Sequence, residues 1–277
     1  MRYVFVSDIH GKFDLLVEAL NGVNFNKEKD TLVSVGDPFD RGPASKEVLD
    51  YLLSCPNRIL IWGNHDARLR QLVFGLDYIA GFDISNGVPE TLESFTHMSR
   101  KSVGLDTMIY ALNFPQNREV RDKLFQYFHE CCWAIEFKDL IATHAWLPIN
   151  EDTKTHGLKL KADWRKTTWT KWFDASWAHS QNLSKRTACY PEKPLLIGHW
   201  HAWRLAQEHG HMRTINAKPA WGEHVNCDTF ILGDKKLIAI DGCSNYPYGG
   251  KVNAYVYKSD EEPIKHFATS DGIYESL

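Results

Sequence analysis

The chain has 277 residues, a formal net charge of -3 and a sequence pI near 6.5, with 43% hydrophobic and 24% charged residues. This composition is typical of a globular protein with one sizeable α/β core, and it argues against binding nucleic acid by charge alone. The apolar runs are shorter than the roughly 18 residues that a membrane span needs, and the first is too short for a signal peptide.

Six cysteines are present, and none forms a Cys-x-x-Cys pair. In a chain of this size the pattern indicates buried, reduced thiols rather than a disulfide framework. We therefore expect a cytoplasmic protein with no membrane partner and no nucleic-acid partner.

Three short apolar runs each lead directly into a polar cluster. Residues 3–6 precede 7–11, residues 31–35 precede 36–42, and residues 58–62 precede 63–66. Apolar residues at helical spacing separate the runs, which predicts consecutive βα units in a parallel sheet. In such a sheet the chemistry gathers at the carboxyl ends of the strands, so the three clusters are expected to meet.

The middle of the chain has mixed periodicity, and we predict a helical cap insertion at about residues 75–130. Further strands are expected at 132–137, 140–143, 195–197, 229–232, 237–240 and 252–257. No linker interrupts the pattern, so a single domain over residues 1–277 is predicted. The polar stretch 151–193 is rich in tryptophan, and two interpretations stay open: core or rim packing, or a substrate-facing wall. Its tryptophans are Trp164, Trp169, Trp172 and Trp177.

The strand-end clusters supply the donor types of a two-metal site. These candidate ligands are Asp8, His10, Asp37, Asn64, His144 and His199. Asp8 and His10 are two residues apart and would point the same way from an extended strand end, and Asp37 has two oxygens with which to bridge two ions. Mixed nitrogen and oxygen donors suit Mn, Fe, Zn or Co rather than calcium. Two such ions sharing a carboxylate and a water form a phosphoryl-transfer site, in which that water attacks phosphorus.

The same clusters resemble a known family. Asp-Ile-His-Gly at 8–11, Gly-Asp-Pro-Phe-Asp-Arg-Gly at 36–42 and Gly-Asn-His-Asp at 63–66 resemble the successive motifs of calcineurin-like metallophosphoesterases. More closely, they are similar to the phosphoprotein phosphatases, including the bacterial and phage members. Residues 143–145 and 198–199 match that family's later histidine motifs, and 241–242 with 249–250 resemble its final turn. The resemblance implies an α/β fold in which a two-sheet β-sandwich is flanked by helices.

The resemblance also implies roles for individual residues. One metal would be held by Asp8, His10 and Asp37, and the other by Asp37, Asn64, His144 and His199. Mn²⁺ is the expected ion, with Fe, Zn or Co as alternatives. His65 would be the general acid, with Asp40 keeping its imidazole protonated and oriented, and Arg41 would clamp the phosphate. Arg165 is the best match for the family's second phosphate-binding arginine.

Three features depart from the phosphoprotein phosphatase pattern. Asp66 stands where those enzymes usually have Glu, and Gly198-His199-Trp200 with Asp241-Gly242-Cys243 is more similar to the symmetrical diadenosine tetraphosphatases. Asp40 argues against that branch, whose members often lack this carboxylate. His201 has the spacing of an additional metal ligand in the wider superfamily, or else it is a neighbouring histidine at the rim of the site.

The first hypothesis is therefore a dinuclear metal-dependent phosphoesterase that hydrolyses phosphomonoesters, with phosphoserine or phosphothreonine in proteins as the substrate. The alternative is a symmetrical bis(5'-nucleosyl)-tetraphosphatase, which would cleave diadenosine tetraphosphate to ADP. A third hypothesis, a catalytically silent binding module, would not require His65, Asp40 and Arg41. The expected partner is thus a phosphorylated protein or a small phosphoester or nucleotide.

Overall fold

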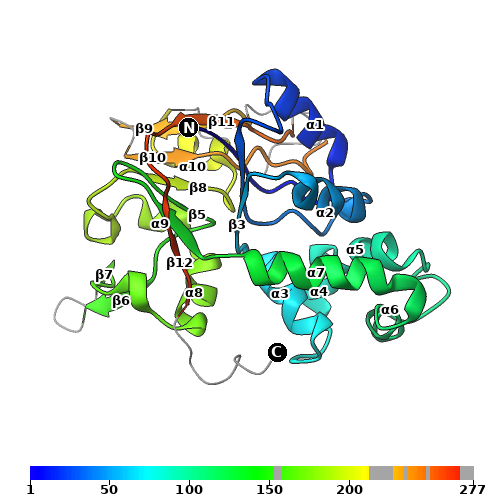
Figure 1. The fold of residues 1–277 in the computed structure, drawn as a ribbon. Coiled ribbons are helices and arrows are strands. Elements are labelled where there is room, and N and C mark those ends of the chain that lie inside the picture. Colours follow the sequence, from blue (N-terminus) through cyan, green and yellow to red (C-terminus); the bar gives the residue numbers. More distant parts are fainter. Residues whose placement is uncertain (153–156, 212–226, 234–235, 248–249, 269–277) are drawn as a thin grey trace.

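Two β-sheets lie face to face at the centre of the protein, and helices cover their outer sides (Figure 1). This is seen in a computed structural model, which describes residues 1–152, 157–211, 227–233, 236–247 and 250–268. The predicted α/β fold with two sheets flanked by helices is confirmed.

The first sheet contains the predicted βα units. Its strand order is β11-β1-β2-β3, with β1 at Arg2–Val6, β2 at Thr31–Val35, β3 at Arg58–Ile61 and β11 at Tyr255–Lys258. The first three strands are parallel, and β11 runs antiparallel to β1. Helices α1 (Phe13–Gly22), α2 (Ser45–Ser54) and α3 (Asn64–Val73) follow β1, β2 and β3 in turn. The polar clusters therefore sit at the carboxyl ends of adjacent parallel strands, as predicted.

The second sheet has six strands in the order β12-β4-β5-β8-β10-β9. Their bounds are β4 Ala134–Glu136, β5 Ile141–Thr143, β8 Leu195–Ile197, β9 Phe230–Leu232, β10 Leu237–Ala239 and β12 Ile264–His266. Strand β12 was not predicted, because Ile-Lys-His is too short and too polar to stand out. The same holds for a separate hairpin of β6 (Ile149–Asp152) and β7 (Gly157–Leu160).

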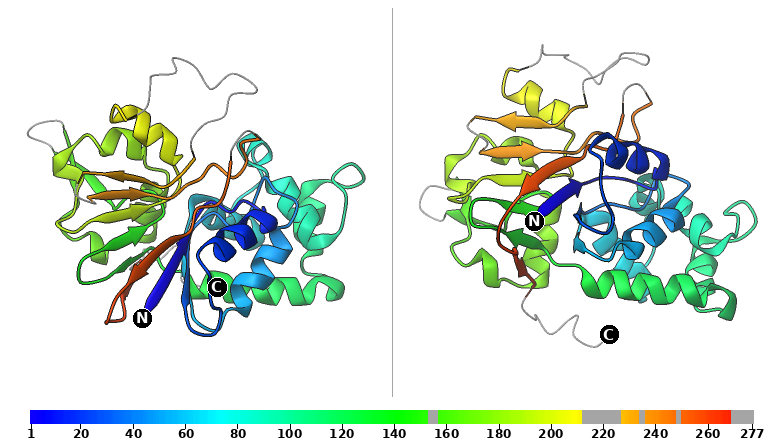
Figure 2. Two further views of the ribbon diagram at one scale, coloured as in Figure 1. Left: turned by 90° about the horizontal axis from the view of Figure 1, so that it is seen from above. Right: turned by 45° about the horizontal axis from the view of Figure 1, so that its top comes forward.

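The two faces of the first sheet bury different sets of residues, because side chains alternate along a strand. Tyr3 and Phe5 face the second sheet and pack there with Ile135 and Phe137. Val4, on the opposite face, belongs to the cluster that includes the buried residues of α1 and α2. Figure 2 shows the result from two further directions: the first sheet separates these helices from the second sheet. The ligand-bearing loops are thus anchored on both sides by apolar packing.

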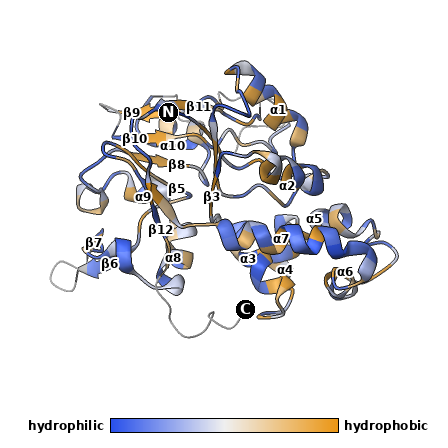
Figure 3. Ribbon diagram, viewed as in Figure 1, coloured by the Kyte–Doolittle hydropathy of each residue, from blue (hydrophilic) through white to orange (hydrophobic). Residues whose placement is uncertain are grey.

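The stretch predicted as a helical insertion holds four α-helices and a short 3₁₀ helix. They are α4 (Gly81–Asn86), α5 (Val88–Thr96), α6 (Leu105–Ala111), η1 (Pro115–Asn117) and α7 (Arg118–Glu130). Most of α7 is hydrophilic (Figure 3), and its buried residues include Leu124 and Phe128. Helices α5 and α7 both contact α2, which places the insertion beside the loops that follow the parallel strands.

The tryptophan-rich region forms short elements around the second sheet. They are η2 (Trp164–Lys166), α8 (Trp169–Ser176), α9 (Ser180–Leu183), η3 (Thr187–Cys189) and, after β8, α10 (Ala202–Glu208). Among the residues described, no helix combines the length and the apolarity needed to cross a bilayer.

Candidate active site

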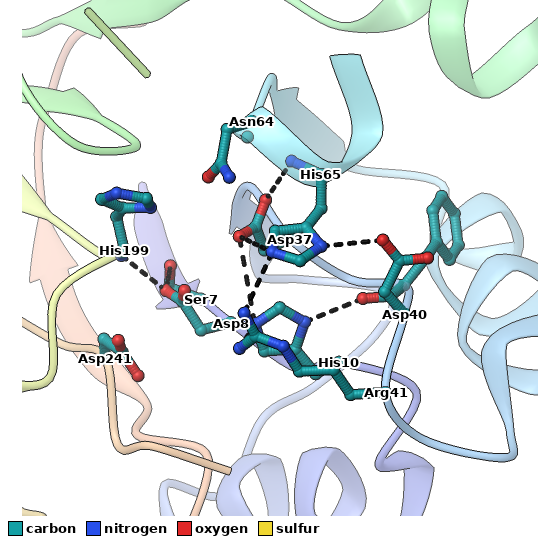
Figure 4. Close-up of polar contacts among 12 residues, drawn as sticks. Ser7, Asp8, His10, Asp37, Asp40, Arg41, Asn64, His65, His199 and Asp241 are labelled. Atoms are coloured by element: carbon teal, nitrogen blue, oxygen red, sulfur yellow. Dashed lines mark hydrogen bonds and ion pairs between the residues drawn. The ribbon is translucent and has the colours of Figure 1, made fainter. Parts of the chain in front are cut away.

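Strained backbone is concentrated in the loops that carry the predicted site residues. Of the nine non-glycine residues with positive φ in the described part of the chain, six are predicted site residues. They are Asp8, His10, Asp37, Asp40, Arg41 and His199. Left-handed backbone is costly for a residue with a side chain and persists where the surrounding structure holds it, as at functional sites. The turns after the strands therefore direct these side chains toward a common space (Figure 4).

Asp37 lies at the centre of this space. One of its carboxylate oxygens, Oδ2, is 3.9 Å from His10 Nε2, 3.9 Å from His65 Nε2 and 3.3 Å from His144 Nε2. The other, Oδ1, accepts a hydrogen bond from the backbone N–H of His65 at 3.0 Å. The structure thus brings the predicted bridging carboxylate into contact with residues from both predicted ligand sets.

A second group of donors surrounds His144. Its Nε2 atom lies 2.9 Å from Asn64 Oδ1 and 3.2 Å from His199 Nδ1, and its Nδ1 atom lies 2.8 Å from the carbonyl oxygen of Val35. Both ring nitrogens therefore face oxygen acceptors. Burial lowers the pKa of His144, but the carboxylates of Asp37 and Asp8 outweigh burial and raise it to about 10. The site consequently favours a positive charge at this point.

Asp8 joins the two halves of the site. Its Oδ2 atom accepts hydrogen bonds from the Ser7 hydroxyl and, at 2.9 Å, from the backbone N–H of His199. Burial raises the pKa of the Asp8 carboxyl well above its usual range, and the nearby Asp241 carboxylate adds to this effect. A bound cation would relieve both effects.

These observations test whether the site fits metal ions. Ligand atoms of His10, Asp37 and His65 lie within 4.8 Å of one another, as do those of Asp37, His144 and His199. The Nδ2 atom of Asn64 is buried without a hydrogen-bond partner, while its Oδ1 atom points at this group. Buried carboxylates and imidazoles that converge in this way fit two divalent cations, and the proton on His144 would have to leave before that nitrogen could bind one.

Beside the ligand groups, His65 is held between a carboxylate and a guanidinium. Its Nδ1 atom is 2.7 Å from Asp40 Oδ2, and its Nε2 atom is 3.1 Å from Arg41. Arg41 also lies 2.8 Å from His10 Nε2. Burial lowers the pKa of His65, but Asp37 and Asp40 outweigh it, so the net pKa is raised. The predicted acid, its carboxylate and the predicted phosphate clamp therefore lie together.

Asp66, noted in the sequence only as a departure from the family pattern, organises two of the loops. Its carboxylate accepts hydrogen bonds from the backbone N–H groups of Asp37 at 3.0 Å and Gly63 at 2.8 Å, and from the Tyr127 hydroxyl at 3.1 Å. Burial and the charge of Asp37 raise the pKa of Asp66 to about 7. The side chain ties the loop after β2 to the loop after β3.

A cavity of about 330 Å³ opens over these groups, and aromatic rings form one wall of it. Trp177 stacks on His65 with ring centroids 6.4 Å apart, and Trp200 lies beside His179 with centroids 4.9 Å apart. By contrast, Trp164 and Trp172 are fully buried in the core. Trp164 and Trp172 thus pack in the core. Trp177 lines the cavity, so a substrate-facing wall stays a prediction for this residue.

Two predicted site residues have partners outside the two ligand groups. Arg165 is not among the residues that line the cavity: its guanidinium pairs with Glu136 at 2.7 and 2.8 Å and packs on the ring of Trp164. His201 lines the cavity, but its Nδ1 atom is 3.0 Å from Asp241 and its Nε2 atom is 3.3 Å from the Cys243 sulfur. It belongs to neither ligand group found among the described residues. Of the predicted final turn, residue 249 lies outside the described residues.

Sequence reasoning missed several contributors, namely Ser7, Asp66, Thr91, His179 and Trp200. Ser7 and Asp66 belong to the quoted clusters, so their positions offered a signal. Thr91 lies inside the insertion, and nothing in the local sequence marks it.

Together the fold and the site define a metal-dependent hydrolase that acts on phosphate esters. Residues 1–203 match the family model described as calcineurin-like phosphoesterase, and the chain belongs to this family.

Curated relatives resemble the chain over a limited segment. The symmetrical bis(5'-nucleosyl)-tetraphosphatase of Hamiltonella defensa is 43% identical over 77 residues, which are 27% of this chain and 28% of that protein. The enzyme of the same name from Salmonella typhimurium is 39% identical over 77 residues, 27% of each chain. The chain thus spans just over a quarter of the length of these relatives. A crystal structure provisionally described as a diadenosine tetraphosphatase matches 96% of this chain and 94% of its own with a TM-score of 0.52 and 18% identity, which shows a shared fold.

Proposed function

We propose that this protein is a dinuclear-metal phosphatase that hydrolyses phosphomonoesters of alcohols, with phosphoserine and phosphothreonine in proteins as the substrate class. One ion would be held by Asp8, His10 and Asp37, and the other by Asp37, Asn64, His144 and His199. We take Mn²⁺ as the expected ion. The donor set also suits Fe, Zn and Co, so these ions are the alternatives. Two such ions supply a nucleophile at neutral pH and neutralise charge on the phosphoryl oxygens.

The observation that carries the proposal is the contact between Asp40 and His65, at 2.7 Å, next to Arg41. An alkoxide leaving from phosphorus is a strong base, so its departure is assisted by a positioned acid. A departing nucleoside diphosphate is a much weaker base and needs this assistance less. An intact acid dyad therefore favours an alcohol ester over a phosphoanhydride.

Arg41 links substrate binding to this acid. Arginine has no acceptor, so the Nε2 atoms of His65 and His10 accept its hydrogens in the structure described here. A phosphate group offers the guanidinium stronger, charged acceptors in a matching fork geometry. Drawing Arg41 toward phosphate frees the His65 nitrogen to carry the proton that the leaving oxygen receives. Trp177 is stacked on the same imidazole, with ring centroids 6.4 Å apart.

The proposal is tested with the full chain after metal removal. Manganese, zinc or iron is then added, and a phosphothreonine peptide, an aryl phosphate and diadenosine tetraphosphate are offered separately. We expect metal-dependent phosphate release from the peptide. Absence of turnover with every metal and every substrate would instead support a binding module.

A second candidate, cleavage of a dinucleoside tetraphosphate, is supported by the aromatic wall. Trp177 and Trp200 offer stacking surfaces for a nucleobase. A neighbouring cavity of about 390 Å³, lined largely by apolar side chains, shares His179 with the first and has room for a further ring. ADP production without phosphate release from the peptide would move the assignment to this activity.

A further inference from the structure

Helix α5 of the insertion is hydrogen-bonded to the loop that carries Asp40 by the hydroxyl of Thr91. It donates to Asp40 Oδ1 at 2.8 Å and accepts from the backbone N–H of Asp40 at 2.7 Å. The Ser45 hydroxyl oxygen lies 3.2 Å from the same atom. A hydroxyl has one hydrogen and two lone pairs, so these three contacts use its full capacity. All three residues are buried, and no solvent competes for these bonds.

The contact fixes the end of the carboxylate that His65 does not touch. Asp40 Oδ2 is 2.7 Å from His65 Nδ1, whereas Oδ1 belongs to Thr91. With both oxygens held, the carboxylate plane cannot rotate, and the imidazole is aligned through it. Thr91 therefore contacts the proposed acid dyad through its hydrogen bond to the Asp40 carboxylate.

The insertion also holds the backbone at this place. Asp40 and Arg41 have φ values of 69° and 65°, which is left-handed backbone that residues with side chains adopt at a cost. The N–H of Arg41 donates to the carbonyl of Gly87 at 3.2 Å. Gly87 has a φ of 94°, and a Cβ placed there would come within 2.2 Å of the Arg41 nitrogen. The insertion thus contacts both residues: the backbone of Gly87 binds Arg41, and the side chain of Thr91 binds Asp40.

We propose that Thr91 is a positioning residue for phosphoester hydrolysis: its hydroxyl holds the Asp40 carboxylate in the orientation that aligns His65 with the leaving oxygen. This inference rests on the proposed function, because it requires His65 to act as an acid. It makes the insertion a working part of the active site and not only a cover beside it.

Removing the Thr91 hydroxyl should affect the reaction rates differently if its role is purely structural than if it positions Asp40. Loss of a structural hydrogen bond lowers stability and reduces the rate on all substrates alike. Loss of alignment in the acid dyad reduces the rate most where the leaving oxygen most needs a proton. The informative quantity is therefore the ratio of kcat for p-nitrophenyl phosphate, with a good leaving group, to kcat for phenyl phosphate, with a poor one.

The test compares manganese-loaded wild type with Thr91→Val, which keeps the shape and removes the hydroxyl. We expect kcat on phenyl phosphate to fall about tenfold or more, which is a part of the full contribution of a general acid. We expect kcat on p-nitrophenyl phosphate to fall much less. Thr91→Ser restores the hydroxyl and should restore the ratio. The matched control is Thr96→Val on the same helix, whose buried hydroxyl donates at 2.7 Å to the carbonyl of Leu92 and does not touch Asp40.

Combining the change with His65→Ala sharpens the test. If Thr91 acts through His65, Thr91→Val should change the leaving-group ratio no further in that background. A ratio unchanged by Thr91→Val in the otherwise wild-type enzyme, or changed equally by Thr96→Val, would overturn the inference. Should Thr91→Val not fold, Thr91→Cys, which supplies a weak donor of similar size, is judged by the same ratio. Lack of any turnover by the wild type refutes the proposed function instead, so the two failures are distinguishable.

Discussion

At the scale of single residues, the site is a set of side chains with more than one partner each. Asp37 faces three imidazoles, and Asp8 accepts from a hydroxyl and a backbone N–H. Removing one partner of a buried charged group leaves the other unpaired, which costs more than the net contribution of the bond. Single substitutions here should therefore have large, specific effects.

His65→Ala tests the proposed acid directly. We expect kcat on a phosphothreonine peptide to fall by about 10²–10⁴-fold, the usual contribution of general acid–base catalysis, with a smaller fall on p-nitrophenyl phosphate. Steady-state kinetics with both substrates measure the difference. His129→Ala, an exposed histidine on α7, serves as the control and should behave as wild type. A peptide rate equal to that of wild type would remove His65 from the mechanism.

Asp66→Asn tests the link between two ligand loops. The carboxylate accepts from the backbone N–H groups of Asp37 and Gly63, and an asparagine would turn an amide N–H₂ toward one of them. We expect affinity for manganese, measured by titration calorimetry, to fall about 10–100-fold, as for other groups that orient metal ligands. Tyr127→Phe removes only one of the three hydrogen-bond donors to Asp66, so its affinity for manganese should fall less. Equal affinities for wild type and Asp66→Asn would show that the loops hold their form without this side chain.

At the scale of elements, Glu136 on β4 ties together separate parts of the second sheet. It pairs with Arg165 of η2, with Lys193 at 2.7 Å and with His266 of β12 at 3.0 Å. The Arg165 guanidinium, with help from Lys193, lowers the pKa of Glu136 to about 2. Arg165, predicted from the sequence to bind phosphate, therefore has a structural partner that already satisfies its guanidinium.

This ion cluster predicts a pH-dependent contribution to stability. The folded pKa of Glu136 is about 2, below the unfolded value of about 4.3, so the contribution is complete above the unfolded value and is lost as pH falls toward 2. Glu136→Gln should lower the free energy of unfolding by about 1–3 kcal/mol at pH 7, and the gap from wild type should narrow below about pH 4. Urea denaturation at pH 7, 5, 4 and 3.5 measures it. Glu119→Gln, at an exposed pair, is the control, and a gap independent of pH would contradict the prediction.

At the scale of the whole molecule, the two sheets supply different halves of the site. Asp8, Asp37 and Asn64 follow strands of the first sheet, while His144 and His199 follow β5 and β8 of the second. The apolar layer between the sheets, which includes Phe5 and Phe137, therefore sets the distance between the two halves. Ligand geometry and global packing are coupled.

Metal removal should consequently affect the stability of the entire protein. Chelation leaves buried carboxylates such as Asp8 without a compensating cation, so we expect a lower unfolding temperature in EDTA and recovery on adding manganese. At a free concentration 100 times Kd, binding to the folded state alone contributes about 2.7 kcal/mol. Differential scanning calorimetry measures the shift. Asp37→Asn, which lacks the bridging carboxylate, should show little response, and an unfolding temperature of wild type insensitive to chelator would argue against the site.

The sequence alone determined the parallel βα units, their order and the polar clusters at the strand ends. Strand alternation, helical spacing and glycine-rich turns are local patterns, and the motif at 36–42 places Asp37, Asp40 and Arg41 within seven residues. These local patterns are why the polar clusters and their place in the fold could be predicted from the sequence.

Only the tertiary structure decided which more distant residues complete the site. Thr91 touches Asp40 across 51 positions in the sequence, and Arg165 joins Glu136 across 29. The tertiary structure also places Trp177 in the cavity wall and Trp172 in the buried core. Such contacts leave no periodic signal, because a single hydroxyl, guanidinium or indole can serve many environments. Its partner is fixed by how helices and sheets pack, and packing depends on the whole chain at once.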